Sequence, residues 1–336
     1  MVEGYKNKHF HPVWGWDINK EEKDSLGTRK NTEYPPKEKY KIKAFGDSYT
    51  YGAEAKENET WEYFIEQQSG WECLNYGVGG YGTDQAFLKY RDSEIKSEYA
   101  ILAIMDENIG RIMINWWGVY SKGGFAVKPR FYSDNSKIKL SPSPITETSK
   151  INNLQDRAFI DKLKKQDYWY NYYLKVDAPD ELRWPATYTL IRHWKFFFRY
   201  TGVFIQNKIS PSFESESATR KYHHLYKSDS EGIQIMRYIV DEFVKTALKK
   251  GETPVILIFP RIDSVDLLAK YNKKVYQPLI DHLNKKQYHY LDLAETFLKD
   301  DYNKYYTAKT KHYSVKGNHR VATAVVEYIQ KLELSN

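Results

Sequence analysis

The sequence has 336 residues, of which 41% are hydrophobic and 16% aromatic, so the chain can bury a large core and is not disordered as a whole. Its net charge of +7 arises from 51 basic and 44 acidic residues that are interspersed, and no nucleic-acid-binding motif accompanies this charge, which argues against a nucleic-acid partner. Cys73 is the only cysteine, which excludes an intramolecular disulfide and a cysteine-based metal cluster.

The sequence contains neither an N-terminal signal peptide nor an apolar stretch of the ~20 residues that would span a bilayer. From the sequence as given we therefore expect a cytoplasmic protein, although an export signal removed from its start would change this expectation.

The first predicted element is an irregular arm over residues 1–39, which are polar and rich in Lys, Asn and Pro. Residues 41–45 then alternate between polar and apolar side chains, which predicts a strand. Because Gly46-Asp47-Ser48 follows directly, we expect this strand to end in a tight turn.

The next predicted elements alternate between helices and strands. They are a helix over 61–67, a strand over 72–75, a glycine-rich loop over 77–82, a helix over 85–96 capped by Thr83 or Asp84, and a strand over 99–105. The last of these runs is almost continuously apolar, as expected of a strand that is buried on both faces.

The alternation resumes near the C-terminal end. The predicted elements there are a helix over 232–250 that stops at Gly251, a strand over 254–259, a helix over 265–283, a strand over 288–293 and a helix over 315–332. Alternating strands and helices predict an α/β fold with a doubly wound, mostly parallel sheet in three layers. In such sheets the reactive groups gather outside the carboxyl ends of the strands, where Ser48, Gly80 and Asn108 are expected.

Residues 111–230 break this alternation and are too long for a structureless loop. We therefore expect an aromatic-rich inserted cap, which divides the α/β domain into residues 40–110 and 231–336. Within the cap, residues 187–206 have helical spacing with aromatic residues on one face. This helix is expected to pack on the α/β body, and contact with a membrane surface is a weaker alternative.

Serine chemistry is the function that the residues at the predicted strand ends suggest. A serine attacks an ester when a neighbouring base takes its proton and donors stabilise the resulting oxyanion. Ser48 is the candidate nucleophile, and His312, in the loop before the last helix, is the candidate base. The amides of Ser48 and Gly80 and the side chain of Asn108 are candidate oxyanion donors.

Four segments in this order resemble the motif blocks of the GDSL or SGNH hydrolase superfamily, and of its members associated with bacterial polysaccharides in particular. The segments are 44–52 (AFGDSYTYG), 75–83 (NYGVGGYGT), 104–108 (IMDEN) and 312–319 (HYSVKGNH). The resemblance implies a three-layer α/β/α fold of the flavodoxin-like kind, and it assigns the same roles to Ser48, Gly80, Asn108 and His312.

The sequence departs from this pattern at two places. The acid that normally stands three residues before the histidine is replaced by Lys309, and the third block reads Asp106-Glu107-Asn108-Ile109 instead of Gly-x-Asn-Asp. Another group therefore has to orient His312. Asp301 is the candidate acid, with Asp300 or a backbone carbonyl as alternatives; without one, the site would be a slow dyad or inactive.

We therefore expect a serine ester hydrolase that removes small O-acyl groups from a carbohydrate or similar substrate, and composition and resemblance favour O-acetyl groups. One alternative is an O-acyltransferase that acts on a glycan with the same Ser48 and His312. The other is a non-catalytic binding protein on a degraded hydrolase fold. The expected chemistry requires no cofactor and no metal.

Overall fold

The computed structural model describes residues 5, 9–31, 34–120, 124–168, 170–171, 185–195, 197–198, 201–202, 205, 213 and 222–335. At its centre lies a five-stranded sheet in the order β4-β3-β5-β8-β9 in which every neighbouring pair is parallel. The strands are β3 (Tyr40–Phe45), β4 (Cys73–Asn75), β5 (Ser97–Met105), β8 (Thr253–Phe259) and β9 (Tyr290–Asp292). The order reverses direction between β3 and β5, so their carboxyl ends form the crevice in which such sheets bind ligands.

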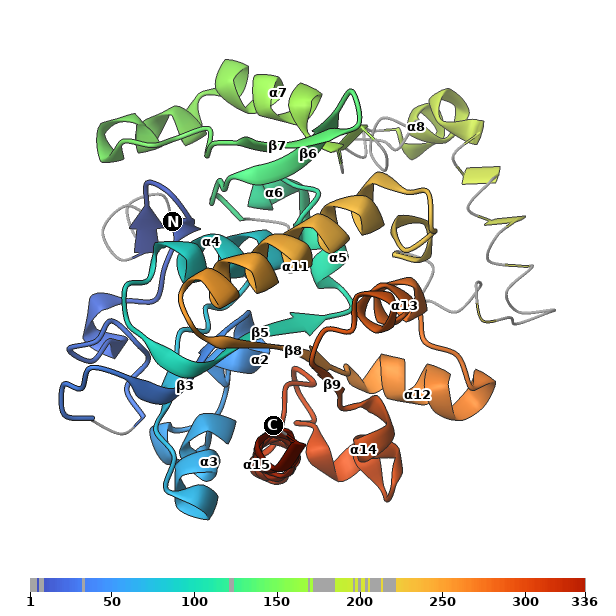
Figure 1. The fold of residues 1–336 in the computed structure, drawn as a ribbon. Coiled ribbons are helices and arrows are strands. Elements are labelled where there is room, and N and C mark those ends of the chain that lie inside the picture. The colour runs from blue at the N-terminus through green and yellow to red at the C-terminus, as the bar shows by residue number, and fades with distance from the viewer. Residues whose placement is uncertain are drawn as a thin grey trace.

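Helices cover both faces of this sheet and complete the predicted three-layer α/β/α fold (Figure 1). One face packs against α4 (Thr83–Asp92), α11 (Glu231–Lys249) and α13 (Gln277–Lys286), and the other against α3 (Trp61–Ser69), α14 (Ala294–Leu298) and α15 (Val315–Ser335). Successive side chains of β5 point to opposite faces. Leu102 and Ile104 therefore join the first layer of the core, whereas Ile101 and Ala103 join the second.

Two predicted helices differ from the structure by more than three residues at one end or by a break. The helix expected over 85–96 starts at Thr83 and ends at Asp92. Its N-cap is Gly82 rather than Thr83 or Asp84, and the Gly82 N–H donates to the side-chain oxygen of Gln85. It ends early because the backbone of Ser93 is extended. The helix expected over 265–283 is two helices, α12 (Ile262–Tyr271) and α13, because Asn272 adopts a left-handed conformation and a proline begins the first turn of α13.

The N-terminal arm is tied to the body of the protein along the described part of its length. Strands β1 (Phe10–His11) and β2 (Gly15–Trp16) form an antiparallel pair. Asp17 is buried and pairs with Lys89 of α4 at 2.7 Å. Further along, Arg29 donates to the carbonyls of Gly52 and Ala55 at 2.8 and 2.6 Å, beside the turn that carries Ser48.

The segment expected to form a cap contains several short elements. In its described part these are α6 (Trp117–Tyr120), an antiparallel pair of β6 (Arg130–Asp134) with β7 (Lys137–Ser141), η4 (Thr148–Gln155), α7 (Arg157–Gln166), α8 (Ala186–Arg192) and η7 (His223–Leu225). The helix expected over 187–206 is only partly described, and α8 ends at Arg192. In the segment 187–206, the side chains of Leu190, Trp194 and Phe198 are more than half exposed. The structure therefore does not pack this apolar face on the α/β body as predicted.

Among the described residues, none of the helices combines the length and the apolar character that a bilayer crossing requires.

A buried ion pair fixes the chain that leaves β5. The ammonium group of Lys128 pairs with the carboxylate of Asp84 in α4, and both side chains are inaccessible to solvent. The same ammonium group donates to the carbonyls of Arg111, Ile114 and Pro129 at 3.0–3.3 Å. Lys128 therefore joins α4 to the chain on both sides of α6.

Replacing this lysine should test how much stability the junction contributes. We expect Lys128→Met to lower the free energy of unfolding in urea by about 3–5 kcal/mol, because the carboxylate of Asp84 loses its partner in the core. The double variant with Asp84→Asn should recover part of this loss. The exposed pair of Lys139 with Asp134 provides the control, because Lys139→Met should leave the free energy of unfolding almost unchanged. A Lys128→Met effect no larger than the control would contradict this role.

Candidate active site

The nucleophile candidate Ser48 lies where β3 turns into a short helix. It is the first residue of α2 (Ser48–Tyr51), and Asp47 caps this helix by accepting the Tyr49 N–H at 2.9 Å. The turn requires glycine at position 46, because a Cβ there would lie 2.1 Å from the Thr50 hydroxyl oxygen. This close packing turns the chain sharply and brings Ser48 to the carboxyl edge of the sheet.

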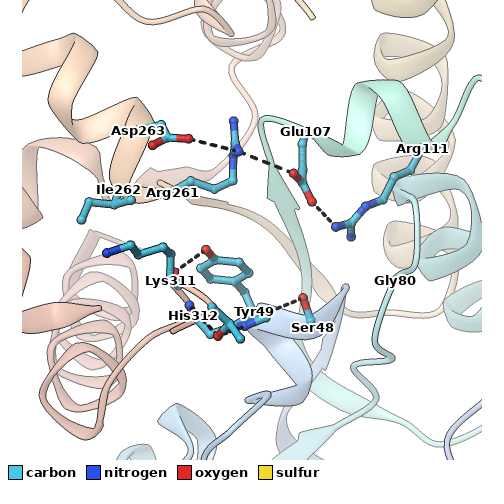
Figure 2. Close-up of a pocket in the computed structure, with 11 residues that line it drawn as sticks. Ser48, Tyr49, Gly80, Glu107, Arg111, Arg261, Ile262, Asp263, Lys311 and His312 are labelled. Atoms are coloured by element: carbon cyan, nitrogen blue, oxygen red, sulfur yellow. Dashed lines mark hydrogen bonds and ion pairs between the residues drawn. The ribbon is translucent and has the colours of Figure 1, made fainter. Parts of the chain in front are cut away.

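The structure brings His312 to this serine. His312 lies in the loop before α15, and its Nε2 is 3.0 Å from Ser48 Oγ, within hydrogen-bonding distance (Figure 2). The loop is held in place because the Tyr49 hydroxyl donates to the Lys311 carbonyl at 2.9 Å. The two predicted catalytic side chains therefore meet although they are far apart in the sequence.

The surroundings of His312 favour its neutral form. Burial lowers the pKa of His312 below its usual 6.5, and the carboxylates of Asp47 and Glu54 oppose this shift only in part. A neutral imidazole can accept the proton of Ser48 at Nε2 when Nδ1 carries a hydrogen. The site thus holds a general base in the protonation state that it needs at neutral pH.

A threonine, and not an acid, lies against the other imidazole nitrogen. Thr310 Oγ1 is 2.8 Å from His312 Nδ1 and donates to Glu54 Oε2 at 2.6 Å. Asp301, the acid expected from the sequence, is not brought to His312; its carboxylate instead caps the 3₁₀ helix η8 (Tyr302–Tyr305) at the Asn303 N–H. The local reason is that Asp301 precedes a helical turn whose free amide it satisfies.

The backbone amides of Ser48 and Gly80, which the sequence suggests as oxyanion donors, belong to residues that line the same pocket. The Ser48 N–H begins a helix, and the first amides of a helix have no acceptor within it. In the described part of the chain, neither the Ser48 N–H nor the Gly80 N–H has a hydrogen-bond acceptor. Gly80 has a φ of +80°, which glycine adopts readily. Both amides expected as oxyanion donors are therefore available.

Asn108 is oriented differently from the sequence-based expectation. Its side-chain Nδ2 donates to Asp47 Oδ2 at 2.9 Å and to the Tyr81 carbonyl at 3.4 Å. Its side-chain Oδ1 accepts a hydrogen bond from the Met105 N–H. The side chain is buried and is not among the residues that line the pocket. Asn108 thus holds the Asp47 carboxylate, and this arrangement does not support the oxyanion role.

Ser48 and His312 open into a pocket of about 430 Å³. Across it from them stands a row of charged side chains in which Glu107 lies between Arg111 and Arg261 (Figure 2). Arg261 is fixed by two hydrogen bonds to the carboxylate of Asp106, at 2.6 and 3.0 Å. The described residues that line the pocket are Ser48, Tyr49, Gly80, Glu107, Arg111, Arg261, Ile262, Asp263, Thr310, Lys311 and His312.

Several residues that line the pocket or lie beside it were not predicted as parts of the site. Arg261 could have been found, because it follows the strand β8 within two residues and so lies at the reactive edge of the sheet. Glu54 and Thr310 carry no such signal. Their contact joins the turn after α2 to the loop before α15, and only folding brings these two segments together.

Comparisons with known proteins give distant structural likenesses. No protein-family model and no curated protein sequence matches the chain. Among solved structures, a lipolytic protein of the G-D-S-L family from Veillonella parvula is similar with a TM-score of 0.41 and 12% identity, covering 85% of this chain and 96% of the other. A protein assigned to the same lipolytic family from Desulfitobacterium hafniense gives a TM-score of 0.41 and 9% identity over 87% of this chain and 99% of the other.

The state of His312 predicts how activity depends on pH. Because its pKa lies below 6.5, kcat/KM for an ester substrate should rise through an acid limb centred below pH 6.5 and stay constant from there to about pH 8. Stopped-flow or plate-reader hydrolysis of p-nitrophenyl acetate between pH 4.5 and 9 measures this profile. A midpoint above pH 7 would show that the imidazole is not held in its neutral form.

Proposed function

We propose that this chain is a serine esterase that removes small O-acyl groups, above all O-acetyl groups, from a carbohydrate or a similar polyhydroxy compound. The observation that carries the proposal is the 3.0 Å contact between Ser48 Oγ and His312 Nε2, in a pocket that Gly80 also lines. Within the described part of the chain, the backbone amides of Ser48 and Gly80 have no acceptor. A binding protein on a degraded hydrolase fold would have no need of this contact, which favours catalysis.

The geometry supports a two-step reaction through an acyl-enzyme. Ser48 Oγ attacks the acyl carbon while its proton passes to His312 Nε2, and the amides of Ser48 and Gly80 stabilise the oxyanion. When the intermediate collapses, the ester C–O bond breaks and His312 gives its proton to the departing alcohol. A water molecule then attacks the acyl carbon, gives a proton to His312 and releases the acid, and Ser48 recovers its proton.

The pocket supports a small acyl group. Among its described lining residues, Ile262 is the one aliphatic side chain, whereas Glu107, Arg111, Arg261 and Asp263 are charged. A long acyl chain would have to remove water from these charges without replacing their hydrogen bonds, which costs free energy. An acetyl group needs little apolar surface and leaves the charges hydrated.

Aromatic side chains beside the oxyanion glycine support a carbohydrate as the alcohol. Trp16 and Trp117 pack edge to face with ring centroids 5.6 Å apart, and both lie close to Gly80. Flat aromatic surfaces suit the apolar faces of sugar rings. Arg111 of the charged row lies over the Trp117 ring at 5.8 Å, so donors and acceptors for sugar hydroxyls stand next to this aromatic surface.

Labelling with a fluorophosphonate probe tests the nucleophile. We expect the probe to modify Ser48, Ser48→Ala to lose this adduct, and His312→Ala to react about 10²- to 10⁴-fold more slowly, because the proton acceptor is gone. His319→Ala is the matched control, because His319 lies in α15 beside Phe64 and Gln68, away from the pocket, and this variant should react like the wild type. Mass spectrometry of the intact and digested protein measures each rate and site.

Absence of an adduct on the folded wild-type protein between pH 6 and 9 would argue against an activated serine and for the non-catalytic alternative. If Ser48 is modified, acetate release from an acetylated xylo-oligosaccharide separates hydrolysis from transfer. Hydrolysis releases one acetate for each ester that is lost, whereas transfer to an added oligosaccharide conserves the ester.

The carbohydrate part of the proposal can be tested at Trp117. We expect Trp117→Ala to lower kcat/KM for an acetylated xylo-oligosaccharide about fivefold, because a stacking surface is worth about 1 kcal/mol. The value for ethyl acetate, which has no ring to stack, should change less than about twofold. Trp117→Phe, which keeps an aromatic face, is the control for folding. Equal losses on both substrates would show that Trp117 supports the oxyanion loop and does not bind a sugar.

A further inference from the structure

We propose that the Thr310 hydroxyl and the Glu54 carboxylate position His312 for catalysis, taking the place of an acid bonded directly to the imidazole. The proposal rests on the esterase function proposed above, and it explains how the site can work although Lys309 occupies the usual position of the acid.

The contacts form a continuous chain of hydrogen bonds. Thr310 donates its hydroxyl proton to Glu54 Oε2 at 2.6 Å, and Thr307 donates to the same oxygen at 2.9 Å. Because an ionised carboxylate can only accept, the Thr310 hydroxyl proton is directed to Glu54. The lone pairs of Thr310 Oγ1 then face His312 Nδ1 at 2.8 Å, so Thr310 accepts a hydrogen bond from the imidazole.

This direction of donation fixes the tautomer of His312. A neutral imidazole carries one hydrogen, and the acceptor beside Nδ1 keeps the hydrogen there. Nε2 is thereby left with a lone pair, which is what it needs to accept the proton of Ser48 Oγ. Without Glu54, the Thr310 hydroxyl could rotate and donate to Nδ1, which would favour the tautomer that cannot act as base.

The backbone around Glu54 shows that its position is imposed by the fold. Glu54 has a φ of +70°, a left-handed conformation that residues other than glycine adopt only at a cost in free energy. Arg29 of the N-terminal arm holds this turn by donating to the carbonyls of Gly52 and Ala55. On the other side, Lys311 also has a positive φ, of +63°, and its carbonyl is bound by Tyr49.

The charge of Glu54 has a second effect. Hydrogen bonds from Thr310 and Thr307 lower the pKa of this exposed carboxyl, so it is ionised at neutral pH. A negative charge near the imidazole favours the imidazolium that forms in each step, and Glu54 raises the pKa of His312 in this way. Asp47 and Glu107 act in the same direction on His312, and Arg111 acts against them.

The test compares single variants that remove one link at a time. Thr310→Val removes the hydroxyl, Thr310→Ser retains it, and Glu54→Gln removes the charge. Asp301→Asn is the matched control, because Asp301 caps η8 and has no contact with His312. For each protein, the rate of Ser48 labelling by a fluorophosphonate is measured from pH 4.5 to 9, and ¹⁵N NMR of the histidines reports the tautomer of His312, assigned with His312→Ala.

We expect Thr310→Val to label about 10- to 100-fold more slowly and to lose the Nδ1–H tautomer, because one hydrogen bond to the base is gone. Thr310→Ser and Asp301→Asn should resemble the wild type. Glu54→Gln should be slower, with the acid limb shifted to lower pH, because the pKa of His312 falls when the nearby negative charge is removed.

Wild-type rates and an unchanged His312 tautomer in both Thr310→Val and Glu54→Gln would overturn the relay while leaving the esterase intact. If wild-type Ser48 is not labelled at all, the proposed function fails, and the NMR result still decides the relay. A tautomer that changes in Thr310→Val then supports it, and one that does not change overturns it.

Discussion

At the carboxyl end of β3, the buried carboxylate of Asp47 accepts hydrogen bonds from both sides of the crevice. One oxygen accepts the Tyr49 N–H and shapes the turn at the nucleophile, and the other accepts from Asn108 and Arg111, which follow β5. A buried carboxylate is costly unless its oxygens are bonded, so these donors are held in place. This requirement joins the ends of two neighbouring strands. It explains why Asn108 faces inward and why Arg111 stands at the edge of the pocket.

Against this fixed framework, the base is held by a network at the surface. Burial of the His312 imidazole lowers its pKa and favours the neutral form. Glu54 and Thr310, in contrast, are exposed to solvent. In the proposed relay, the hydroxyl supplies direction and the carboxylate supplies charge, which a single aspartate would supply together. Separation of the two weakens the electrostatic contribution, because water screens an exposed charge. The expected result is a modest esterase whose base has the correct tautomer.

The N-terminal arm and the chain that follows β5 both contribute contacts around this site. The arm contributes Arg29 to the turn of Glu54 and Trp16 to the wall beside Gly80. The chain that follows β5 contributes Trp117 to the same wall, and Lys128 fixes that chain to α4 through a buried ion pair. In the proposed function and the proposed relay, substrate binding and the positioning of the base would therefore depend on residues outside the α/β core.

The α/β/α fold could be predicted from the sequence, because buried strands such as 99–105 and amphipathic helices show their periodicity locally. It also pointed to Ser48, Gly80 and His312, because these residues stand in segments that resemble the motif blocks of a hydrolase superfamily. It did not predict the orientation of Asn108 or the relay from Glu54 to His312. These features depend on the folded chain, because a side chain's hydrogen-bond partner is set by which distant segments pack against it. The hydrogen bond between Glu54 and Thr310 could not be predicted from the periodicity of the sequence.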